Sequence, residues 1–325
     1  MKVVVVGCRG WGQIHLRALA QLGVDLEIME RDREAARTCV ERYGARKVYE
    51  SYSSVLSSDA DVVDLVVPHH LHRDMAVEAL KAGRHVLVEK PMARTEAEAL
   101  DMINAAKSVR RKLMVADQFH FDPAVRAVMD MIREGRLGRV HTIIVRSQTL
   151  GRPRNWRTRL EEMGGGALID GGVHFVNTLL NFGGDYEEVK AYVYRASVPM
   201  EGDDTAVAIF RFKSGAHGLL YYSWAYPNAP LLPSYEVVGD AGSVVEDLET
   251  KRRTWSPPRY RVYGDPVLNG RRVEVPDVDV FVEMFRGFLR AVEEDAEVPY
   301  PPELSLRDLR GVLDIYRAAR APWLK

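Results

Sequence analysis

Two patterns of apolar residues divide the chain near residue 119. In the first part, short continuous runs of valine, leucine and isoleucine alternate with segments whose apolar residues recur every three or four positions. Continuous runs predict strands buried on both faces, and the periodic segments predict helices. The predicted strands are 2–7, 25–30, 62–68, 85–91 and 113–119, and the predicted helices are 11–22, 34–43, 72–83 and 95–110. This alternation predicts an α/β fold with a doubly wound parallel sheet.

Beyond residue 119, apolar and polar residues alternate one by one. Such alternation predicts an antiparallel sheet with one face on a core and the other face open. Lys213-Ser214-Gly215 and Asp240-Ala241-Gly242 are typical hairpin turns. The predicted strands are 139–150, 188–196, 203–212, 216–226, 234–240 and 242–249, and the predicted helices are 123–134, 278–294 and 304–320. We therefore expect two domains, one over 1–119 and an α+β domain with a large, mostly antiparallel open sheet over 120–325.

Composition, charge and cysteine content narrow the class of protein. The chain has 325 residues, of which 46% are hydrophobic and 28% charged, and its net charge is −1. These values are typical of a globular protein. The chain has no excess of basic residues, which a protein that binds nucleic acid or an anionic membrane normally has. The two cysteines, Cys8 and Cys39, do not suggest a disulfide framework or a cysteine-rich zinc site. No signal-peptide pattern and no membrane-spanning apolar stretch are visible, so we expect a cytoplasmic protein.

The stretch VGCRGWGQIH near the N-terminus is the first candidate for chemistry. It follows the first predicted strand and opens a helix, where backbone N–H groups and the helix dipole hold a pyrophosphate. Gly7 and Gly12 fit the G-x-G-x-x-G frame of a dinucleotide-binding turn, but Arg9 takes the middle position and Gly10 comes one residue late. Glu30, at the end of the second predicted strand, stands where such folds bind a ribose 2′-hydroxyl. A glycine-rich connection without a ligand is the alternative for this turn taken alone.

Several longer stretches share their motifs with one known family. In chain order they are the N-terminal VGCRGWGQIHLRAL with His15, the P-x-x-x-H of Pro68 and His72, the E-K-P of Glu89-Lys90-Pro91, the NWR of 155–157 and the G-G-G-x-L-x-D-x-x-x-H of 164–174. In this combination the motifs resemble the Gfo/Idh/MocA family, named after glucose–fructose oxidoreductase, inositol dehydrogenase and a rhizopine-catabolism protein. The resemblance covers about residues 1–320.

The resemblance implies a function and a set of site residues. It implies an NAD(P)-dependent oxidoreductase that transfers a hydride between the nicotinamide and a hydroxyl or carbonyl carbon of a sugar, inositol or related polyol. The N-terminal Rossmann domain would bind the cofactor through Gly7, Arg9, Gly10, Trp11, Gly12, Glu30, Arg31, Pro68, His69, His72, Glu89, Lys90 and Gln118. The substrate would contact Lys90, His120, Trp156, Arg157, Asp170 and His174. The family also implies a homodimer or homotetramer formed through the C-terminal sheet. No metal is expected, because hydride transfer to nicotinamide needs none.

Three of these residues are the expected catalytic ones. Lys90 ends a predicted strand, so its amine would project into the crevice at the sheet edge; a lysine that extends to solvent is the alternative. Asp170 and His174 are four residues apart, which places both on one face of a helix. A helix-capping Asp and a packed core His are the alternative for that pair. With the family match, His174 is expected to accept the alcohol proton, Lys90 to hydrogen-bond the same oxygen, and Asp170 to orient His174 or hold a second hydroxyl.

Other side chains have two interpretations each. Arg9 either contacts a cofactor phosphate or points to solvent. His69 and His70 are expected in a loop near the cofactor, and His72 is expected to cap the helix that follows. His120 lines the substrate cavity or has a structural role. For the aromatic residues that share one strand face, sheet packing or a subunit interface is favoured over a sugar platform; these are Tyr222, Trp224 and Tyr226.

The cofactor and the reaction have alternatives as well. Glu30 would repel a 2′-phosphate and favour NAD, whereas Arg31 and Arg33 would pair with that phosphate, so NAD is expected and NADP is possible. An enzyme that uses retained NAD in a net non-redox reaction, such as a glycosidase or epimerase, is one rival function. A non-catalytic binding or regulatory protein is the other, and the presence together of the three expected catalytic residues argues against it.

Overall fold

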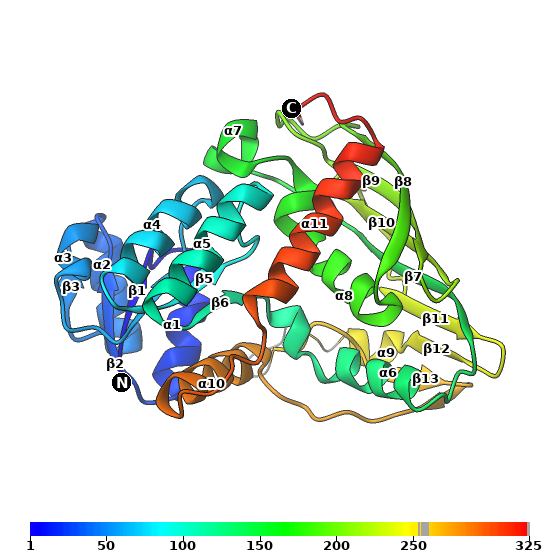
Figure 1. The fold of residues 1–325 in the computed structure, drawn as a ribbon, viewed down its shortest axis with the longest axis horizontal. Helices are drawn as coiled ribbons and strands as arrows, with labels where there is room; N and C mark the ends of the chain where they lie inside the picture. Colours follow the sequence, from blue (N-terminus) through cyan, green and yellow to red (C-terminus); the bar gives the residue numbers. More distant parts are fainter. Residues whose placement is uncertain (253, 255–259, 324–325) are drawn as a thin grey trace. The chain divides into compact units, whose positions relative to one another are not determined.

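The computed structural model describes residues 1–252, 254 and 260–323 (Figure 1). The chain forms two compact units, one of Met1–Asp117 with Phe281–Leu306 and the other of Gln118–Val280 with Arg307–Lys325. The first change of unit falls between Asp117 and Gln118, and 281–306 groups with the N-terminal unit. Phe281 packs its ring 6.0 Å from that of Trp11, and Phe285 meets the ring of His15 at 5.1 Å. These aromatic contacts explain why this helical segment belongs to the first unit.

The first unit is built on a parallel six-stranded sheet. Its strands follow the order β3-β2-β1-β4-β5-β6. The strands are β1 (Lys2–Val6), β2 (Asp25–Met29), β3 (Val48–Tyr49), β4 (Val62–Leu65), β5 (His85–Glu89) and β6 (Leu113–Ala116). The helices are α1 (Trp11–Gln21), α2 (Arg33–Tyr43), α3 (Tyr52–Leu56), α4 (His69–Lys81), α5 (Glu96–Val109) and α10 (Val280–Glu293). The predicted doubly wound fold is confirmed, and the strand order reverses beside β1, where open α/β sheets bind their ligands.

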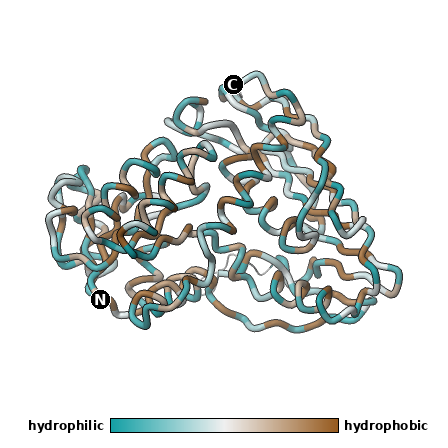
Figure 2. The backbone as a smooth tube through the Cα atoms, in the orientation of Figure 1, coloured by the Kyte–Doolittle hydropathy of each residue, from teal (hydrophilic) through white to brown (hydrophobic). Residues whose placement is uncertain are grey.

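Burial explains the apolar runs that predicted these strands. Val3–Val6 of β1 and Val86–Val88 of β5 are almost completely buried. In Figure 2 the hydrophobic colour gathers along the strands of this unit, whereas its outer loops are mostly hydrophilic. Helices on both faces therefore shield the central strands, as the sequence predicts. The sequence did not predict β3 or α3, because elements of two and five residues are too short to give a periodic signal.

The second unit is built on an eight-stranded mixed sheet. Its order is β14-β13-β12-β11-β7-β10-β9-β8, and only β7 and β10 pair in parallel among the strands described. The strands are β7 (Val140–Gln148), β8 (Tyr186–Tyr194), β9 (Thr205–Phe212), β10 (His217–Ser223), β11 (Tyr235–Gly239), β12 (Ser243–Glu246), β13 (Pro266–Leu268) and β14 (Arg271–Arg272). The helices are α6 (Pro123–Arg133), α7 (Leu160–Met163), α8 (Val173–Gly183), α9 (Leu248–Lys251) and α11 (Pro302–Ala318). The predicted large, mostly antiparallel sheet is confirmed.

The two faces of this sheet differ in how far their side chains are exposed. Tyr222 is buried and packs its ring 5.4 Å from that of Phe175 on α8, which agrees with the sheet-packing interpretation. Large apolar side chains are exposed on β8 and β9, where Tyr192 is 79% and Ile209 50% accessible. Large exposed apolar patches commonly mark protein–protein contacts. In the part of the chain that the structure describes, no helix has the length and apolar character needed to cross a membrane.

Candidate active site

Two of the three glycines in the first turn are required by close packing. A Cβ atom on Gly7 would lie 2.3 Å from the carbonyl oxygen of Val66, and one on Gly12 would lie 2.0 Å from the carbonyl oxygen of Gly7. Gly10 faces open space but has a φ of 56°, in the left-handed region that glycine adopts most easily. The turn therefore lets α1 start directly against the ends of β1 and β4. This geometry meets the steric requirements of a dinucleotide-binding turn in spite of Arg9.

Arg9 lies over the turn that follows β2. Its Nη1 is 3.2 Å from Oδ2 of Asp32, and both side chains are exposed. Asp32 also caps α2 by accepting hydrogen bonds from the backbone N–H groups of Glu34 and Ala35. Arg9 thus has a protein partner beside the end of β2 instead of projecting freely into solvent.

Glu30 is held by backbone donors on two sides. Its Oε1 accepts hydrogen bonds from the N–H groups of Arg31 at 2.9 Å and Asp32 at 3.1 Å. Its Oε2 accepts one from the N–H of Cys8 at 3.3 Å, in the glycine turn. The carboxylate therefore joins the turns after β1 and β2 at the carboxyl edge of the sheet. That is the position from which an acidic residue reaches a ribose hydroxyl.

Lys90 follows the last residue of β5 and is only 7% exposed. An extended lysine that carries its ammonium out to solvent would be far more accessible. The backbone N–H of Lys90 donates to Oε2 of Glu89 at 3.1 Å, so the preceding side chain holds the strand end. The Lys90–Pro91 peptide bond is cis.

A buried cluster of three titratable side chains, His15, Asp64 and Glu89, lies next to the end of β5. Nε2 of His15 is 2.8 Å from Oε1 of Glu89, and Nδ1 is 2.9 Å from Oδ2 of Asp64, in the middle of β4. Burial opposes a charge on the ring, but attraction and hydrogen bonds to the two carboxylates outweigh it and raise the pKa of His15 to about 10. Burial raises the pKa of Asp64 as well, against the attraction of His15. The sequence signalled His15 only as part of a family motif and gave no signal for Asp64.

The prediction that His72 caps the helix after Pro68 is wrong. Helix α4 begins at His69 after Pro68, so His69 and His70 lie in its first turn and not in a loop. The ring of His72 is buried, with Nδ1 2.9 Å from the carbonyl oxygen of Pro91 and Nε2 2.9 Å from that of Val67. A capping side chain would accept from N–H groups, whereas this ring faces two carbonyls. Burial and the neighbouring His69 lower the pKa of His72 to about 4, so the ring is neutral and donates to one of the two carbonyls.

In the second unit, the glycines of 164–166 fit around a buried polar pair. A Cβ on Gly166 would lie 2.0 Å from the carbonyl oxygen of Asp203, and one on Gly165 would lie 2.5 Å from the hydroxyl of Tyr316. That hydroxyl donates to Oδ1 of Asp203 at 2.7 Å, and the N–H of Leu168 donates to Oδ2 at 2.9 Å. Burial raises the pKa of Asp203 to about 6 despite these hydrogen bonds. The pair fixes the backbone that leads to Asp170, and the sequence did not reveal it.

The spacing of Asp170 and His174 does not span a regular α-helix. Asp170 lies in a π-helical turn, Leu168–Gly172, and His174 lies in the first turn of α8. Such turns are rare and often occur at functional sites. No side chain caps the start of either segment, which excludes the helix-capping interpretation of Asp170. Its position in a wider turn changes the angle between the two side chains from the one that the four-residue spacing predicts.

Asp170 is buried and ion-paired. Nε of Arg157 donates to its Oδ2 at 2.8 Å, and the Arg157 guanidinium lies 4.3 Å from the centre of the Trp156 ring. The structure thus brings together three of the expected substrate residues. Trp156 in turn packs on a buried cluster of Met163, Val198 and Met200.

His174 is buried against an aromatic side chain. Its ring stacks on that of Phe119, with centroids 4.1 Å apart and an interplanar angle of 5°. Phe119 lies in a short 3₁₀ segment, Gln118–Phe121, that replaces the end of the strand predicted over 113–119. His120, in the same segment, is half-buried with its ring 5.5 Å from that of Phe121. The sequence gave no signal for the Phe119 stack.

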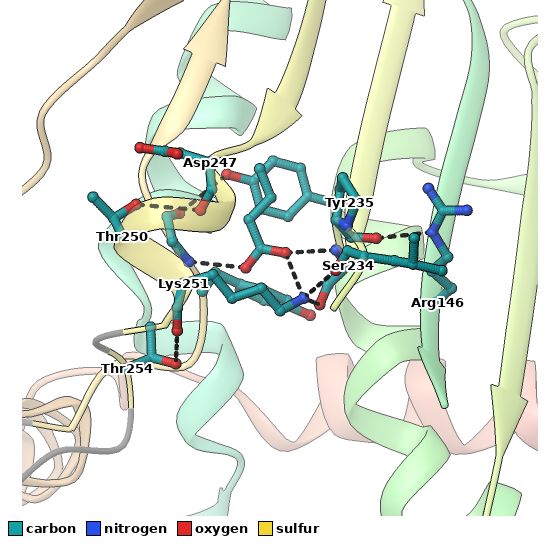
Figure 3. Close-up of polar contacts among 12 residues, drawn as sticks. Arg146, Ser234, Tyr235, Asp247, Thr250, Lys251 and Thr254 are labelled. Carbon is teal, nitrogen blue, oxygen red and sulfur yellow. Dashed lines mark hydrogen bonds and ion pairs between the residues drawn. The ribbon is translucent and has the colours of Figure 1, made fainter. Parts of the chain in front are cut away.

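A cavity of about 400 Å³ adjoins this stack within the second unit. Phe119 and Phe175 form part of its wall, and another part is formed by polar residues of β7 and α9 together with Ser234, which precedes β11 (Figure 3). Among the described residues, no group of three or more His, Cys, Asp or Glu side chains is arranged to hold a metal ion.

The fold and these groups define a class of protein. A doubly wound sheet with a dinucleotide-type turn, an acidic residue after β2 and a buried lysine after β5 is the framework of a nicotinamide-binding oxidoreductase. Comparison with protein families agrees. Residues 1–117 match the oxidoreductase family with an NAD-binding Rossmann fold, and residues 125–245 match the GFO/IDH/MocA C-terminal domain. The chain belongs to the Gfo/Idh/MocA family, and the resemblance seen in the sequence motifs is confirmed.

Several relatives have names that describe their reactions. Levoglucosan dehydrogenase of Pseudarthrobacter phenanthrenivorans is 27% identical over 69% of this chain and 65% of its own length. The 1,5-anhydro-D-fructose reductase of Ensifer adhaerens is 32% identical over 58% of this chain and 57% of its own. The matches thus span less than two thirds of these relatives. The WlbA dehydrogenase of Bordetella pertussis, solved with NADH and UDP-GlcNAcA, is 27% identical with a TM-score of 0.82, over 99% of this chain and 97% of that one.

Proposed function

We propose that the protein is an NAD(P)-dependent oxidoreductase acting on a CH–OH group of a sugar, inositol or related polyol. One observation carries the proposal: Lys90 is held, largely buried, at the carboxyl end of β5 in a sheet whose β1 turn has the glycine geometry of a dinucleotide site. A structural lysine has no need of burial at that edge. The names of the relatives, which include a levoglucosan dehydrogenase and an anhydrofructose reductase, support the substrate class.

The residues of the first unit fit a dinucleotide. The β1 turn leaves the helix N-terminus accessible to a pyrophosphate because Gly7 and Gly12 carry no side chains, and Glu30 is fixed for a ribose hydroxyl. When bound, the nicotinamide supplies the hydride acceptor or donor. Lys90 donates a hydrogen bond to the reacting oxygen, and His174 takes the hydroxyl proton in the oxidation direction. Asp170, held by Arg157, positions a neighbouring hydroxyl of the substrate or His174.

Turnover of a substrate panel tests the proposal. Purified protein is incubated with sugars, inositols and polyols and each oxidised cofactor, and with the matching ketoses and each reduced cofactor, while NAD(P)H absorbance is followed. Change in absorbance with at least one compound is expected. Protein that carries NAD through purification, converts a glycoside or epimer and shows no net redox change would instead indicate the NAD-assisted non-redox alternative.

Glu30 is expected to make NADH bind more tightly than NADPH. Its carboxylate repels a 2′-phosphate and already occupies the N–H groups of Arg31 and Asp32. Glu30→Ala removes the repulsion and frees these donors, so NADPH affinity should rise by about 10–100-fold. Fluorescence titration measures both affinities, with Glu34→Ala as a control on the same helix start. Tighter NADPH binding by the unaltered protein would show that Arg31 and Arg33 dominate.

Arg9 is expected to add modestly to cofactor binding. Its guanidinium stands next to the ribose side of the turn but is exposed and shared with Asp32, so solvent and salt weaken its effect. Arg9→Ala should weaken NADH binding near the lower end of about 1–3 kcal/mol, and less at high salt. Asp32→Asn keeps the helix cap but releases Arg9, and should leave binding equal or tighter. Unchanged NADH affinity in Arg9→Ala at low salt would limit Arg9 to its pair with Asp32.

We further propose a cytoplasmic homodimer or homotetramer that pairs through the open face of the C-terminal sheet. The exposed Tyr192, Tyr194 and Ile209 on β8 and β9 support this surface, and the free thiols of Cys8 and Cys39 agree with a reducing compartment. Light scattering should give a dimer or tetramer mass, and Tyr192→Arg should lower it. A monomeric mass for the unaltered protein would contradict the proposal.

A further inference from the structure

The loop between β7 and α7, residues 151–159, is strongly basic. It contains four arginines and no acidic residue, in a chain whose net charge is −1, and is here called the arginine loop. Arg152 and Arg154 are exposed, and within the described part of the chain neither guanidinium makes a hydrogen bond or an ion pair. The N–H donors of these two arginines are therefore available to a ligand.

The other two arginines of the loop already have acidic partners. Nε of Arg157 donates to Oδ2 of Asp170 at 2.8 Å, and Nε of Arg159 lies 3.0 Å from Oε1 of Glu162 on α7. The buried charge of Asp170 is thus balanced by Arg157. The two exposed arginines are not needed to neutralise it.

The start of the arginine loop is packed against the π turn that contains Asp170. The N–H of Gly151 donates to the carbonyl oxygen of Trp224 at 2.8 Å, and a Cβ on Gly151 would lie 2.6 Å from Cγ of the indole. The same indole reaches Gly171, where an added Cβ would lie 3.5 Å from Cζ2. Nε1 of Trp224 donates to the hydroxyl of Tyr222 at 2.7 Å, which fixes the ring. The Trp224 indole therefore lies between the start of the loop and the residue that follows Asp170.

The end of the arginine loop is attached to the same turn. Residues Asn155–Thr158 form a 3₁₀ turn, and from it Arg157 pairs with Asp170. Trp156 and Trp224 pack on one buried cluster, the three side chains described above beside Trp156. The loop is thus anchored next to Asp170 at both ends, and its two unpaired arginines lie between the attachment points.

We propose that Arg152 and Arg154 bind a phosphate or carboxylate group of the substrate, at the end away from its reacting hydroxyl. The inference rests on the proposed oxidoreductase function, in which Asp170 positions a substrate hydroxyl or His174. A guanidinium matches the oxygens of either anion with two parallel N–H donors. Pro153, between the two arginines, restricts the backbone and so reduces the conformational entropy that binding removes.

The inference narrows the substrate class. Anchoring at both ends keeps the positive charge of the loop beside the candidate site, where it also attracts an anionic substrate from solution. Sugars and polyols in general are thereby narrowed to those that carry a negative charge, namely sugar acids, sugar or polyol phosphates and nucleoside-diphosphate sugars.

The test compares matched neutral and anionic substrates. The kcat/KM values are measured at low salt with both cofactors, for pairs such as a polyol and its phosphate, an aldose and its uronic acid, and a hexose and its nucleoside-diphosphate form. The anionic member of at least one pair should be preferred by about 10-fold or more, and that pair identifies the anion. Because the arginines are exposed, added salt should reduce the preference. Equal or higher kcat/KM for the neutral member of every pair overturns the inference and leaves the oxidoreductase function standing.

Removal of both unpaired arginines tests their part directly. Arg152→Gln with Arg154→Gln should lower the anionic-to-neutral ratio of kcat/KM by about 10–100-fold, chiefly through KM for the anionic member, with NADH affinity unchanged. Arg133→Gln with Arg139→Gln removes the same charge from two exposed positions of the second unit. This matched control should leave the ratio unchanged.

The control and the assembly state separate other roles of the arginine loop. An equal loss of preference in both double variants would assign the effect to net charge alone and overturn the inference. An unchanged ratio with a lower mass by light scattering would assign the two arginines to a subunit contact, and would overturn it as well. Absence of turnover with every compound and both cofactors overturns the proposed function, and the inference with it.

Discussion

His174→Ala and Lys90→Ala are each expected to lower kcat by about 10²–10⁴-fold while leaving NADH affinity nearly unchanged. General acid–base groups typically contribute that factor, and neither side chain is needed to hold the adenosine half of the cofactor. Both residues are largely buried, so bulk water has little access to either side chain. Steady-state kinetics and NADH titration separate the two effects. His217→Ala and Lys213→Ala, which change exposed residues of the second sheet, are matched controls and should be neutral.

The double variant makes this prediction specific. His174→Ala with Lys90→Ala should lose less than the product of the single losses, because we propose that both groups act on one oxygen of the substrate. Asp170→Asn should also reduce activity, because a neutral amide in the π turn cannot form the ion pair that Asp170 makes with Arg157. Near-normal kcat in His174→Ala would move the proposed base to Lys90 first and to His120 second.

Local pattern predicted most of the fold for a clear physical reason. The strands of the first sheet are buried on both faces, so each appears in the sequence as an apolar run bounded by glycine, proline or charge. The second sheet has one covered and one open face, so its strands alternate. Elements held by tertiary contacts escaped prediction. The end of the strand expected over 113–119 becomes a 3₁₀ segment because Phe119 turns to stack on His174, a contact between residues far apart in the chain.

The candidate site likewise has residues that the sequence predicted and residues that it could not predict. Family motifs indicated Lys90, Asp170 and His174 as candidates, because each of these residues lies within a motif that is visible in the sequence. The residues that hold these side chains in place could not be predicted from the sequence, because each of them acts through a partner that is distant in the sequence. Tyr316 holds the glycine segment before Asp170 from the other end of the chain. His72 illustrates the converse: at the start of the helix predicted over 72–83 it has the sequence position of a cap, but its ring lies between the carbonyls of Val67 and Pro91.

His15→Ala is expected to destabilise the first unit by about 3–5 kcal/mol, the cost of leaving buried charges without their partner. The ring lies within 2.9 Å of Asp64 and 2.8 Å of Glu89, and a neutral imidazole donates from one nitrogen only. Both contacts are satisfied together when the ring carries two protons, in agreement with a pKa raised to about 10. Because Oε2 of Glu89 also accepts the N–H of Lys90, loss of His15 should lower kcat as well by displacing the end of β5.

The pH dependence of unfolding distinguishes a charged ring from a merely packed one. An unfolded histidine has a pKa of about 6.5, so the stability that the folded ring contributes is complete below that pH and is lost as pH rises through about 10. The free energy of unfolding of the unaltered protein should therefore fall between about pH 6.5 and 10, and His15→Ala should lack that part of the decline. Urea unfolding at several pH values, with hydrogen exchange to localise the change to the first unit, measures the difference, and the exposed His141→Ala is the control. Adding Asp64→Asn to His15→Ala should restore part of the stability by removing one uncompensated carboxylate. If His15→Ala and His141→Ala unfold alike at every pH, the ring carries no charge in the fold, and Glu89 must hold Lys90 without it.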